Sequence, residues 1–323
     1  MYKEVAKAIK KAKKIYIATH INPDGDAIGS SIGLMLALRK IGKDVKVILP
    51  SFSDTFKFLD ETGKAVDEII EDEVDLLIYT DSSSLDRVSI KEEDIKKAKV
   101  TCLVDHHKKN KDFTDYAIVE EDAPAACEVV YKLIKKLRIK LDKDIAKYLY
   151  VGLMTDTGSF KYSNTSPVTH IIAADLISTG IDFSELSKNI FDTMKESKLR
   201  LLGKYIDNIE KLYDEKIIYG LVEYEDIEKL GLSDEDSEGM TNYGQKIEGC
   251  EVSIYVRGRQ DGTYKVSMRS NGKVDLADIA IKYLGGGHAR AAGFSIENKE
   301  RLNEIKYELV DIIKEKLVWF QEY

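Results

Sequence analysis

Residues 14–42 read KIYIATHINPDGDAIGSSIGLMLALRKIG, and they contain the three parts of a βα unit. The apolar run at 14–20 predicts a strand, the polar residues after it predict a loop, and the pattern at 27–42 predicts a helix. Residues 43–50 predict a second strand, which Pro50 ends. Strands that alternate with helices in this way are typical of an α/β fold with a doubly wound parallel sheet.

The same alternation continues through the first half of the chain. Residues 74–81 and 100–107 are two further apolar runs, and each ends in aspartate or histidine. Helices are predicted near 125–137 and 142–154. Because continuous apolar strands fit burial on both faces of a sheet, we expect residues 1–185 to form one parallel-sheet domain.

The second half has a different pattern and predicts a smaller α+β domain at 213–323. Runs that predict strands occur at 216–224, 251–259, 263–270 and 292–296. Asp261-Gly262 predicts a hairpin turn between two of them. Helices are predicted at 274–284 and near 298–318, and the charged, helical stretch 186–212 is expected to be the linker between the two domains.

Length and composition agree with a soluble two-domain protein. A chain of 323 residues is too long for one ordinary core. It has no run of eighteen apolar residues, and its lysine-rich N-terminus predicts an amphipathic helix and not an export signal. Three scattered cysteines, Cys102, Cys127 and Cys250, favour neither a disulfide framework nor a zinc site. We therefore expect a cytoplasmic protein with no membrane partner.

The net charge of −8 also bears on the partners of the protein. An acidic protein is poorly suited to binding a long nucleic acid duplex, because many contacts of basic residues with phosphates drive that affinity. It remains compatible with a local basic pocket for a small anion, and with clustered carboxylates that bind cations.

The loop after the first strand contains His20, Asp24 and Asp26 within seven positions. A turn accounts for Pro23 and Gly25, but it does not account for a histidine with two carboxylates. Histidine and aspartate are common ligands of divalent metals. Taken alone, the loop fits a metal site and a capped turn equally well.

Further acids and histidines follow the other predicted elements. Asp81 ends one strand, Asp105-His106-His107 end the next, and Asp156 ends a helix. Adjacent histidines in a strand point to opposite sides, so one could bind metal while the other contacts substrate. Ligands bind at the carboxyl ends of parallel strands, where most of these side chains are expected. We expect two divalent cations there, with Mn²⁺ favoured over Zn²⁺ or Mg²⁺ because carboxylates and imidazoles, and no thiolates, would bind them.

The second half contains candidate substrate contacts. Gly285-Gly286-Gly287-His288 could bring backbone N–H groups and an imidazole to an anion, although a helix C-cap is the alternative explanation. Arg269, Ser270 and Asn271 are candidates that could contact a phosphate or a base. In the first half, Arg87 could bind a phosphate, but its position in the sequence is equally consistent with an exposed surface arginine.

Taken together, these motifs resemble those of the DHH phosphoesterase superfamily. The matching blocks are HINPDGDAIGSS (20–31), YTDSSSLDRV (79–88), LVDHH (103–107) and TDTGSF (155–160), in the expected order. The stretches GGGHARAAG (285–293) and SMRSNGKVDLADIA (267–280) resemble the DHH-associated domain. The resemblance therefore covers essentially the whole chain.

The resemblance implies a role for each residue of the first domain. One cation would be held by His20, Asp24 and Asp81, and the other by Asp26, Asp81, His106 and Asp156, with Asp81 bridging. Asp105 would orient a histidine ligand, and His107 would lie beside the reacting phosphate. The DHH-associated domain would hold the substrate against the metal site.

Within the superfamily, the chain resembles the bifunctional nanoRNase/pAp phosphatases. It has no room for the extra nucleic-acid-binding domain of RecJ-type exonucleases, and its GGGH block argues against type II pyrophosphatases. The expected substrates are short RNA or DNA oligonucleotides, linear dinucleotides and 3′-phosphoadenosine 5′-phosphate (pAp), with Mn²⁺, or alternatively Mg²⁺ or Co²⁺, as cofactor. A short RecJ-like exonuclease and a non-catalytic nucleotide-binding module are the alternatives. The sequence leaves open whether the protein forms a homodimer.

Overall fold

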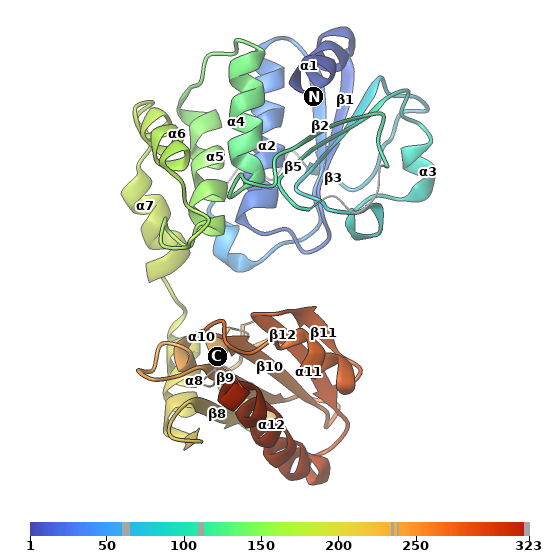
Figure 1. The fold of residues 1–323 in the computed structure, drawn as a ribbon. Coiled ribbons are helices and arrows are strands. Elements are labelled where there is room, and N and C mark those ends of the chain that lie inside the picture. Colours follow the sequence, from blue (N-terminus) through green and yellow to red (C-terminus); the bar gives the residue numbers. More distant parts are fainter. Residues whose placement is uncertain (60–64, 109–112, 234–235, 238, 320–323) are drawn as a thin grey trace. The chain divides into compact units, whose positions relative to one another are not determined.

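The computed structural model describes residues 1–59, 65–108, 113–233, 236–237 and 239–319. The chain separates into two compact units, Met1–Thr193 and Met194–Tyr323 (Figure 1). The stretch expected to be the linker, 186–212, contains this division. It includes the end of helix α7 (Phe183–Ser187), a π-helix at Lys188–Asp192, helix α8 (Glu196–Asp207) and strand β7 (Ile209–Leu212).

The first unit contains a six-stranded sheet in which all of the strand pairs are parallel. Its strands are β1 (Lys14–Ala18), β2 (Asp44–Ile48), β3 (Ala65–Val66), β4 (Leu76–Thr80), β5 (Thr101–Asp105) and β6 (Tyr116–Val119). They are arranged in the order β3-β2-β1-β4-β5-β6, so the strand order reverses between β1 and β4. The predicted α/β fold with a parallel sheet is confirmed. An open sheet of this kind binds ligands at the carboxyl ends of its strands, at the point of reversal.

Both faces of this sheet are buried, as the continuous apolar strands predicted. On one face Ile15, Ile17 and Ile78 belong to the large core that the helices form. On the other face Tyr16 and Tyr79 belong to a smaller core beneath the segment around helix α3 (Glu92–Ile95). The remaining helices of the unit are α1 (Tyr2–Lys11), α2 (Gly25–Lys40), α4 (Ala126–Lys136), α5 (Lys143–Asp156) and α6 (Pro167–Ile177).

Helices α2 and α5 pack closely because glycines lie in their interface. A Cβ atom on Gly29 of α2 would collide with the carbonyl oxygen of Tyr148, and one on Gly33 would lie 3.0 Å from the Leu149 side chain. On the α5 side, a Cβ atom on Gly152 would lie 3.0 Å from the Cα atom of Asp26 in α2, and it would also collide with the Cys127 sulfur of α4. This close approach fixes the position of the last residue of α5, Asp156, relative to the first turn of α2.

The second unit is a mixed six-stranded sheet with helices, so the predicted α+β class is also correct. Its strands are β7, β8 (Ile217–Val222), β9 (Val252–Gly258), β10 (Tyr264–Ser270), β11 (Gly286–His288) and β12 (Ala291–Ile296). Its helices include α8, α9 (Tyr224–Lys229), α10 (Thr241–Gly244), α11 (Ala277–Lys282) and α12 (Lys299–Trp319). Strands β9 and β10 pair antiparallel around Gly262, whose φ of 80° fits the predicted hairpin turn. Within the described part of the chain, no helix is both long and apolar enough to cross a bilayer.

Candidate metal centre

The carboxyl ends of three neighbouring strands bring the first candidate ligands together. His20 follows β1, Asp81 follows β4 and Asp105 ends β5, and these strands are adjacent in the sheet. Asp81 has a φ of 53°, so the chain turns sharply directly after β4. An isolated bridge between His20 and Val88 ties the loop after β1 to the loop after β4. The position at the strand-order reversal is the one expected for a ligand site.

His20, Asp24 and Asp81 form a first cluster, whose ligand atoms all lie within 4.8 Å of one another. The Nε2 atom of His20 lies 3.5 Å from Asp81 Oδ2 and 3.9 Å from Asp24 Oδ1. Asp24 is also the N-cap of α2, since its carboxylate accepts hydrogen bonds from the backbone N–H groups of Asp26 and Ala27. The capped turn and the carboxylate cluster, which the sequence left as alternatives, are therefore both present.

Asp26, His106 and Asp156 form a second cluster of the same dimensions. The Nε2 atom of His106 lies 3.8 Å from Asp26 Oδ2 and 3.6 Å from Asp156 Oδ2. Asp81 joins the two clusters, because its Oδ2 atom faces His20 while its Oδ1 atom lies 3.5 Å from His106 Nε2. The residues that the sequence assigned to two cations are thus gathered around one shared carboxylate.

Backbone groups orient these side chains. The Nδ1 atoms of His20 and His106 lie 2.8 Å from the carbonyl oxygen of Ile21 and 3.1 Å from that of Ala123, respectively. Because a carbonyl oxygen only accepts hydrogen bonds, Nδ1 carries the proton in each ring, and Nε2 is directed into the cluster. This is the second contact that metal-binding histidines usually make in proteins.

Asp26 is held by the start of helix α4. Its carboxylate accepts hydrogen bonds from the backbone N–H groups of Ala126 and Cys127, at 2.5 and 2.9 Å. Those residues are 100 and 101 positions away in the chain. This contribution of residues 123–127 was not predicted, although the small residues and Pro124 directly before a predicted helix were a signal for a helix start near the site.

The cluster needs positive charge. Asp81 Oδ1 and His106 Nε2 are buried and have no hydrogen-bond partner among the residues that the structure describes. Burial, and then the nearby Asp81 carboxylate, raise the pKa of Asp26 to about 7. Burial, and then Asp26, raise the pKa of Asp156 well above its ordinary value. Buried acids that repel one another, beside imidazole nitrogens directed toward them, fit divalent cations with mixed oxygen and nitrogen ligands.

The pKa values of the two histidines are also raised, which favours the charged form of each ring. Burial opposes the protonation of His20 and of His106, but the Asp81 carboxylate outweighs it and raises the pKa of each to about 9. Protons therefore occupy the positions that metal ions would take.

This competition gives a prediction for the pH dependence of metal binding. A metal ion must displace protons from Asp26, with a pKa of about 7, and from His20 and His106, with pKa values of about 9. Below its pKa, each group that loses a proton on metal binding makes the affinity rise tenfold per pH unit, so we expect the affinity for Mn²⁺ to rise by at least about tenfold per pH unit between pH 6 and 8. Calorimetric titration of the metal-free protein at pH 6, 7 and 8 measures it. An affinity that stays constant over this range would contradict the prediction.

His107 lies beside the cluster on the same side as His106. Its Nδ1 atom lies 2.9 Å from Asp105 Oδ1 and 3.5 Å from Asp81 Oδ1, and the two histidine rings are 4.5 Å apart. The expectation that they point to opposite sides of a strand is wrong, because β5 ends at Asp105 and the chain turns before the histidines. His107 is 41% exposed whereas Asp105 is buried, so Asp105 orients an imidazole that solvent can reach.

Arg87 also lies in the first unit, with an exposed side chain. Its carbonyl oxygen accepts a hydrogen bond of 2.8 Å from the N–H group of Ile21, which fixes the loop that carries His20. The backbone of Arg87 thus has a structural role, and its guanidinium remains a candidate for phosphate binding.

The candidates at the end of β10 have structural partners within the second unit. The buried Ser270 hydroxyl accepts hydrogen bonds from the N–H groups of Gly272 and Val274. Asn271 donates to the Cys250 carbonyl oxygen at 2.6 Å and accepts from Gln245. Arg269 donates a hydrogen bond of 3.3 Å from its Nε atom to Asn242 Oδ1, in an exposed position.

The glycine run at 285–287 belongs partly to a helix C-cap and partly to a strand. The N–H group of Gly285 donates to the Ala280 carbonyl oxygen, and Leu284 has a φ of 60°, so this stretch closes α11 as a helix C-cap. Gly286 to His288 form strand β11, which pairs with β12. The helix C-cap, which was the alternative explanation for this run, therefore occupies the N–H group of Gly285.

The remaining glycines differ in the space around them. A Cβ atom on Gly287 would collide with the backbone of Ala291 and Ala292, whereas one on Gly286 would meet nothing within 4 Å. Packing therefore explains Gly287 but not Gly286. Gly286 and the exposed His288 are the members of this block that stay available to a ligand.

The parallel sheet and the histidine–carboxylate cluster at its carboxyl edge define a metal-dependent phosphoesterase, a hydrolase. The family model described as the DHH family, N-terminal domain, matches residues 14–153, and the DHHA1 domain matches residues 202–315. The chain belongs to the DHH family, with a C-terminal DHHA1 domain.

Curated relatives align over nearly their whole length. The chain is 32% identical to the bifunctional oligoribonuclease and PAP phosphatase NrnA of Thermus thermophilus, over 97% of this chain and 93% of the relative. It is 26% identical to the protein of the same name from Bacillus subtilis, over 98% and 99% of the two chains. An uncharacterized protein of Mycoplasma genitalium, MG371, is 24% identical over 94% of this chain and 93% of its own length.

Solved structures agree with this assignment. An exopolyphosphatase-related protein from Bacteroides fragilis superposes with a TM-score of 0.89 at 29% identity, over 98% of this chain and 96% of that one. RecJ of Thermus thermophilus, solved in complex with Mn²⁺, matches at 14% identity with a TM-score of 0.54, over 97% of this chain and 54% of RecJ. The likeness to RecJ is one of fold alone.

Proposed function

We propose that this protein is a two-cation phosphoesterase that hydrolyses short oligonucleotides and linear dinucleotides to mononucleotides and dephosphorylates pAp. The observation that carries the two-cation proposal is the position of Asp81, which presents one carboxylate oxygen to each cluster. The substrate class rests on the relatives, because those named bifunctional oligoribonuclease and PAP phosphatase align across both domains.

In this proposal His20, Asp24 and Asp81 hold one cation, and Asp26, His106, Asp156 and Asp81 hold the other. We propose Mn²⁺, with Mg²⁺ and Co²⁺ as alternatives, because hard carboxylates outnumber the imidazoles. When bound, such a pair of cations neutralises charge on phosphoryl oxygens and lowers the pKa of water.

The protein's own groups then position the substrate. The buried Asp105 carboxylate accepts a hydrogen bond from His107 Nδ1, which keeps the His107 ring beside the cluster with its Nε2 atom available to a phosphate oxygen or a leaving group. From the second unit, we propose that His288, Gly286 and Arg269 contact the phosphate or base of the substrate, because His288 and Gly286 are exposed and Arg269 is half-buried with its guanidinium in an exposed hydrogen bond.

Two other functions remain as alternatives. A RecJ-like exonuclease would share the fold, which is what the likeness to RecJ supports. A non-catalytic nucleotide-binding module would not need the acids that surround His106, and their convergence argues against it.

A comparison of substrates tests the proposal. The protein is incubated with Mn²⁺ and equal concentrations of an RNA dinucleotide, a 24-mer RNA and pAp. We expect fast turnover of the dinucleotide and of pAp and slow turnover of the 24-mer. His288→Ala is expected to raise KM more than it lowers kcat, because it would bind substrate away from the reacting centre.

The other outcomes distinguish the alternatives. Preference for the 24-mer would identify a RecJ-like exonuclease. Binding of the dinucleotide without any turnover, at a metal centre shown to be loaded, would identify a binding module.

A further inference from the structure

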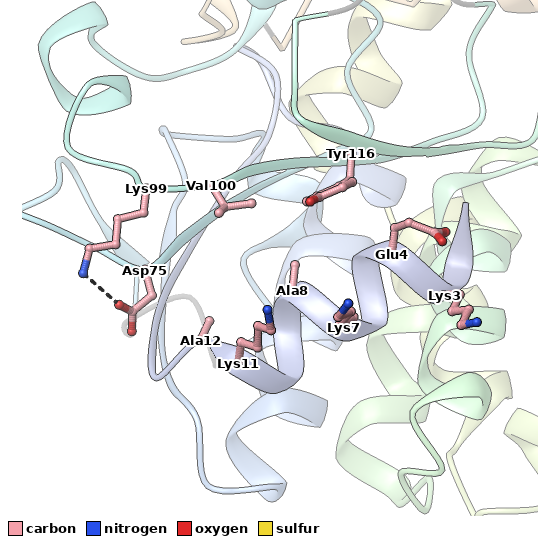
Figure 2. Close-up of a pocket in the computed structure, with 10 residues that line it drawn as sticks. All are labelled: Lys3, Glu4, Lys7, Ala8, Lys11, Ala12, Asp75, Lys99, Val100 and Tyr116. Carbon is pink, nitrogen blue, oxygen red and sulfur yellow. Dashed lines mark hydrogen bonds and ion pairs between the residues drawn. The ribbon is translucent and has the colours of Figure 1, made fainter.

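A hollow of about 490 Å³ lies beside helix α1, at the end of the parallel sheet opposite to the metal centre. We call it the α1 groove. Lys3, Lys7 and Lys11 of α1 line one side, and Lys99 and Tyr116 line the other (Figure 2). Lys99 precedes β5 and Tyr116 begins β6, so the groove is at the amino ends of these strands. A strand of five residues separates it from the metal centre by roughly 16 Å.

The groove concentrates positive charge on an acidic protein. Lys3, Lys7 and Lys11 are four residues apart, so they form one row along the helix with a spacing of about 6 Å. All three are exposed, and none of their ammonium groups has a hydrogen bond or ion pair with the residues that the structure describes. The protein as a whole has a net charge of −8, so this row of lysines is a local exception.

The acids of the groove do not cancel this row. Asp75 is already engaged, because it accepts hydrogen bonds from the backbone N–H groups of Lys13 and Lys14, at 2.8 and 3.1 Å, and pairs with Lys99 at 3.5 Å (Figure 2). Glu4, the other carboxylate, pairs with the N-terminal ammonium group at 3.0 Å, and Lys99 also pairs with Glu73 at 2.7 Å, so the excess positive charge comes from the three lysines of α1. An anion that enters the groove would therefore meet excess positive charge.

The groove also offers an aromatic surface. Tyr116 is 41% exposed, and its side chain extends over α1 above Ala8 (Figure 2). Ala8 and Val100 add a small apolar floor. A row of cations that follows a phosphate backbone, beside an aromatic ring on which a base can stack, is how proteins hold single-stranded nucleic acid.

A membrane surface fits the groove less well. A basic helix that binds a bilayer must insert its apolar side between the lipids. In α1 that side is already used, because Val5 and Ile9 are fully buried in the core of the unit. The lysines are therefore the part of α1 that is left to make contacts.

We propose that the α1 groove binds a short stretch of single-stranded nucleic acid, with phosphates on Lys3, Lys7 and Lys11 and one base on Tyr116. The groove is distinct from the metal centre, and its proposed role does not depend on which phosphoester the metal centre hydrolyses. It would hold a strand to the protein through contacts that take no part in the hydrolysis.

Fluorescence anisotropy with a 5′-labelled 12-mer of oligouridylate tests this proposal. EDTA is present, so that the oligonucleotide is not hydrolysed. The triple variant Lys3→Gln, Lys7→Gln, Lys11→Gln is expected to bind at least about tenfold more weakly in low salt. The slope of log K against log salt concentration should become shallower by about 2, since each phosphate contact on a single strand contributes roughly 0.7. Tyr116→Ala should weaken binding without changing that slope.

A matched variant removes the same charge elsewhere. Lys136, Lys140 and Lys143 are also exposed lysines, and their replacement by glutamine should leave binding unchanged. Both triple variants should keep the turnover of the RNA dinucleotide in Mn²⁺. Equal losses in the two triple variants, or no loss in the α1 variant, would overturn the proposal. So would loss of binding to phosphatidylserine vesicles with unchanged RNA binding, since that result would assign the groove to a membrane.

Discussion

Asp81→Asn is expected to lower the rate of dinucleotide hydrolysis in Mn²⁺ by about 1,000-fold, which corresponds to about 4 kcal/mol of lost transition-state stabilisation. The substitution keeps the shape of the side chain but removes the charge that both clusters share. Asp81 Oδ2 lies 3.5 Å from His20 Nε2, and Asp81 Oδ1 lies 3.5 Å from His106 Nε2. Elemental analysis of the purified protein should also show fewer than the two cations per chain expected of the unmodified protein.

Asp86→Asn is the matched control for this prediction. Asp86 lies in the same loop, five residues further on, and is exposed. It should keep both the turnover and the metal content. If Asp81→Asn kept two cations and lost activity by less than about tenfold, which is about 1.4 kcal/mol, Asp81 would not be the shared ligand.

Gly152→Ala is expected to destabilise the first unit by about 3 kcal/mol and to weaken metal binding. The added methyl group would collide with the Cys127 sulfur and would lie 2.6 Å from Asp26 Oδ1. Both neighbours are buried, and Asp26 is held by backbone N–H groups of α4, so neither can move aside without a shift of a helix. Urea unfolding followed by far-UV circular dichroism, together with Mn²⁺ titration, measures the two effects.

Gly203→Ala provides the comparison. Gly203 is also inside a helix, α8, but it is exposed, and a Cβ atom there would meet nothing within 4 Å. Alanine has the higher helix propensity, so this substitution should leave stability unchanged or raise it by up to about 1 kcal/mol. Equal effects of the two substitutions would show that the packing around Gly152 is looser than the structure indicates.

Much of the fold could be predicted because it depends on local patterns. The apolar runs of β1, β4 and β5 and the intervening helices have periodicities that do not depend on distant residues. Short strands were harder to predict. Strand β3 has two residues and β11 has three, which is too few to show the alternation of apolar and polar residues that indicates a strand. The glycines before His288 could not be assigned from the sequence alone, because a helix cap and an edge strand use the same residue type as an anion loop.

That His20, Asp81 and Asp105 meet follows from local sequence patterns, because parallel strands end at one edge and each of these residues ends or follows a strand. The orientation of the remaining ligands depends on tertiary packing. Asp26 is oriented by N–H groups that are 100 and 101 residues away, and Asp156 is placed by the glycine-lined contact of α2 with α5. Strand ends follow from periodicity along the chain, whereas the direction of a carboxylate depends on which distant segments pack against it, and no local pattern contains that information.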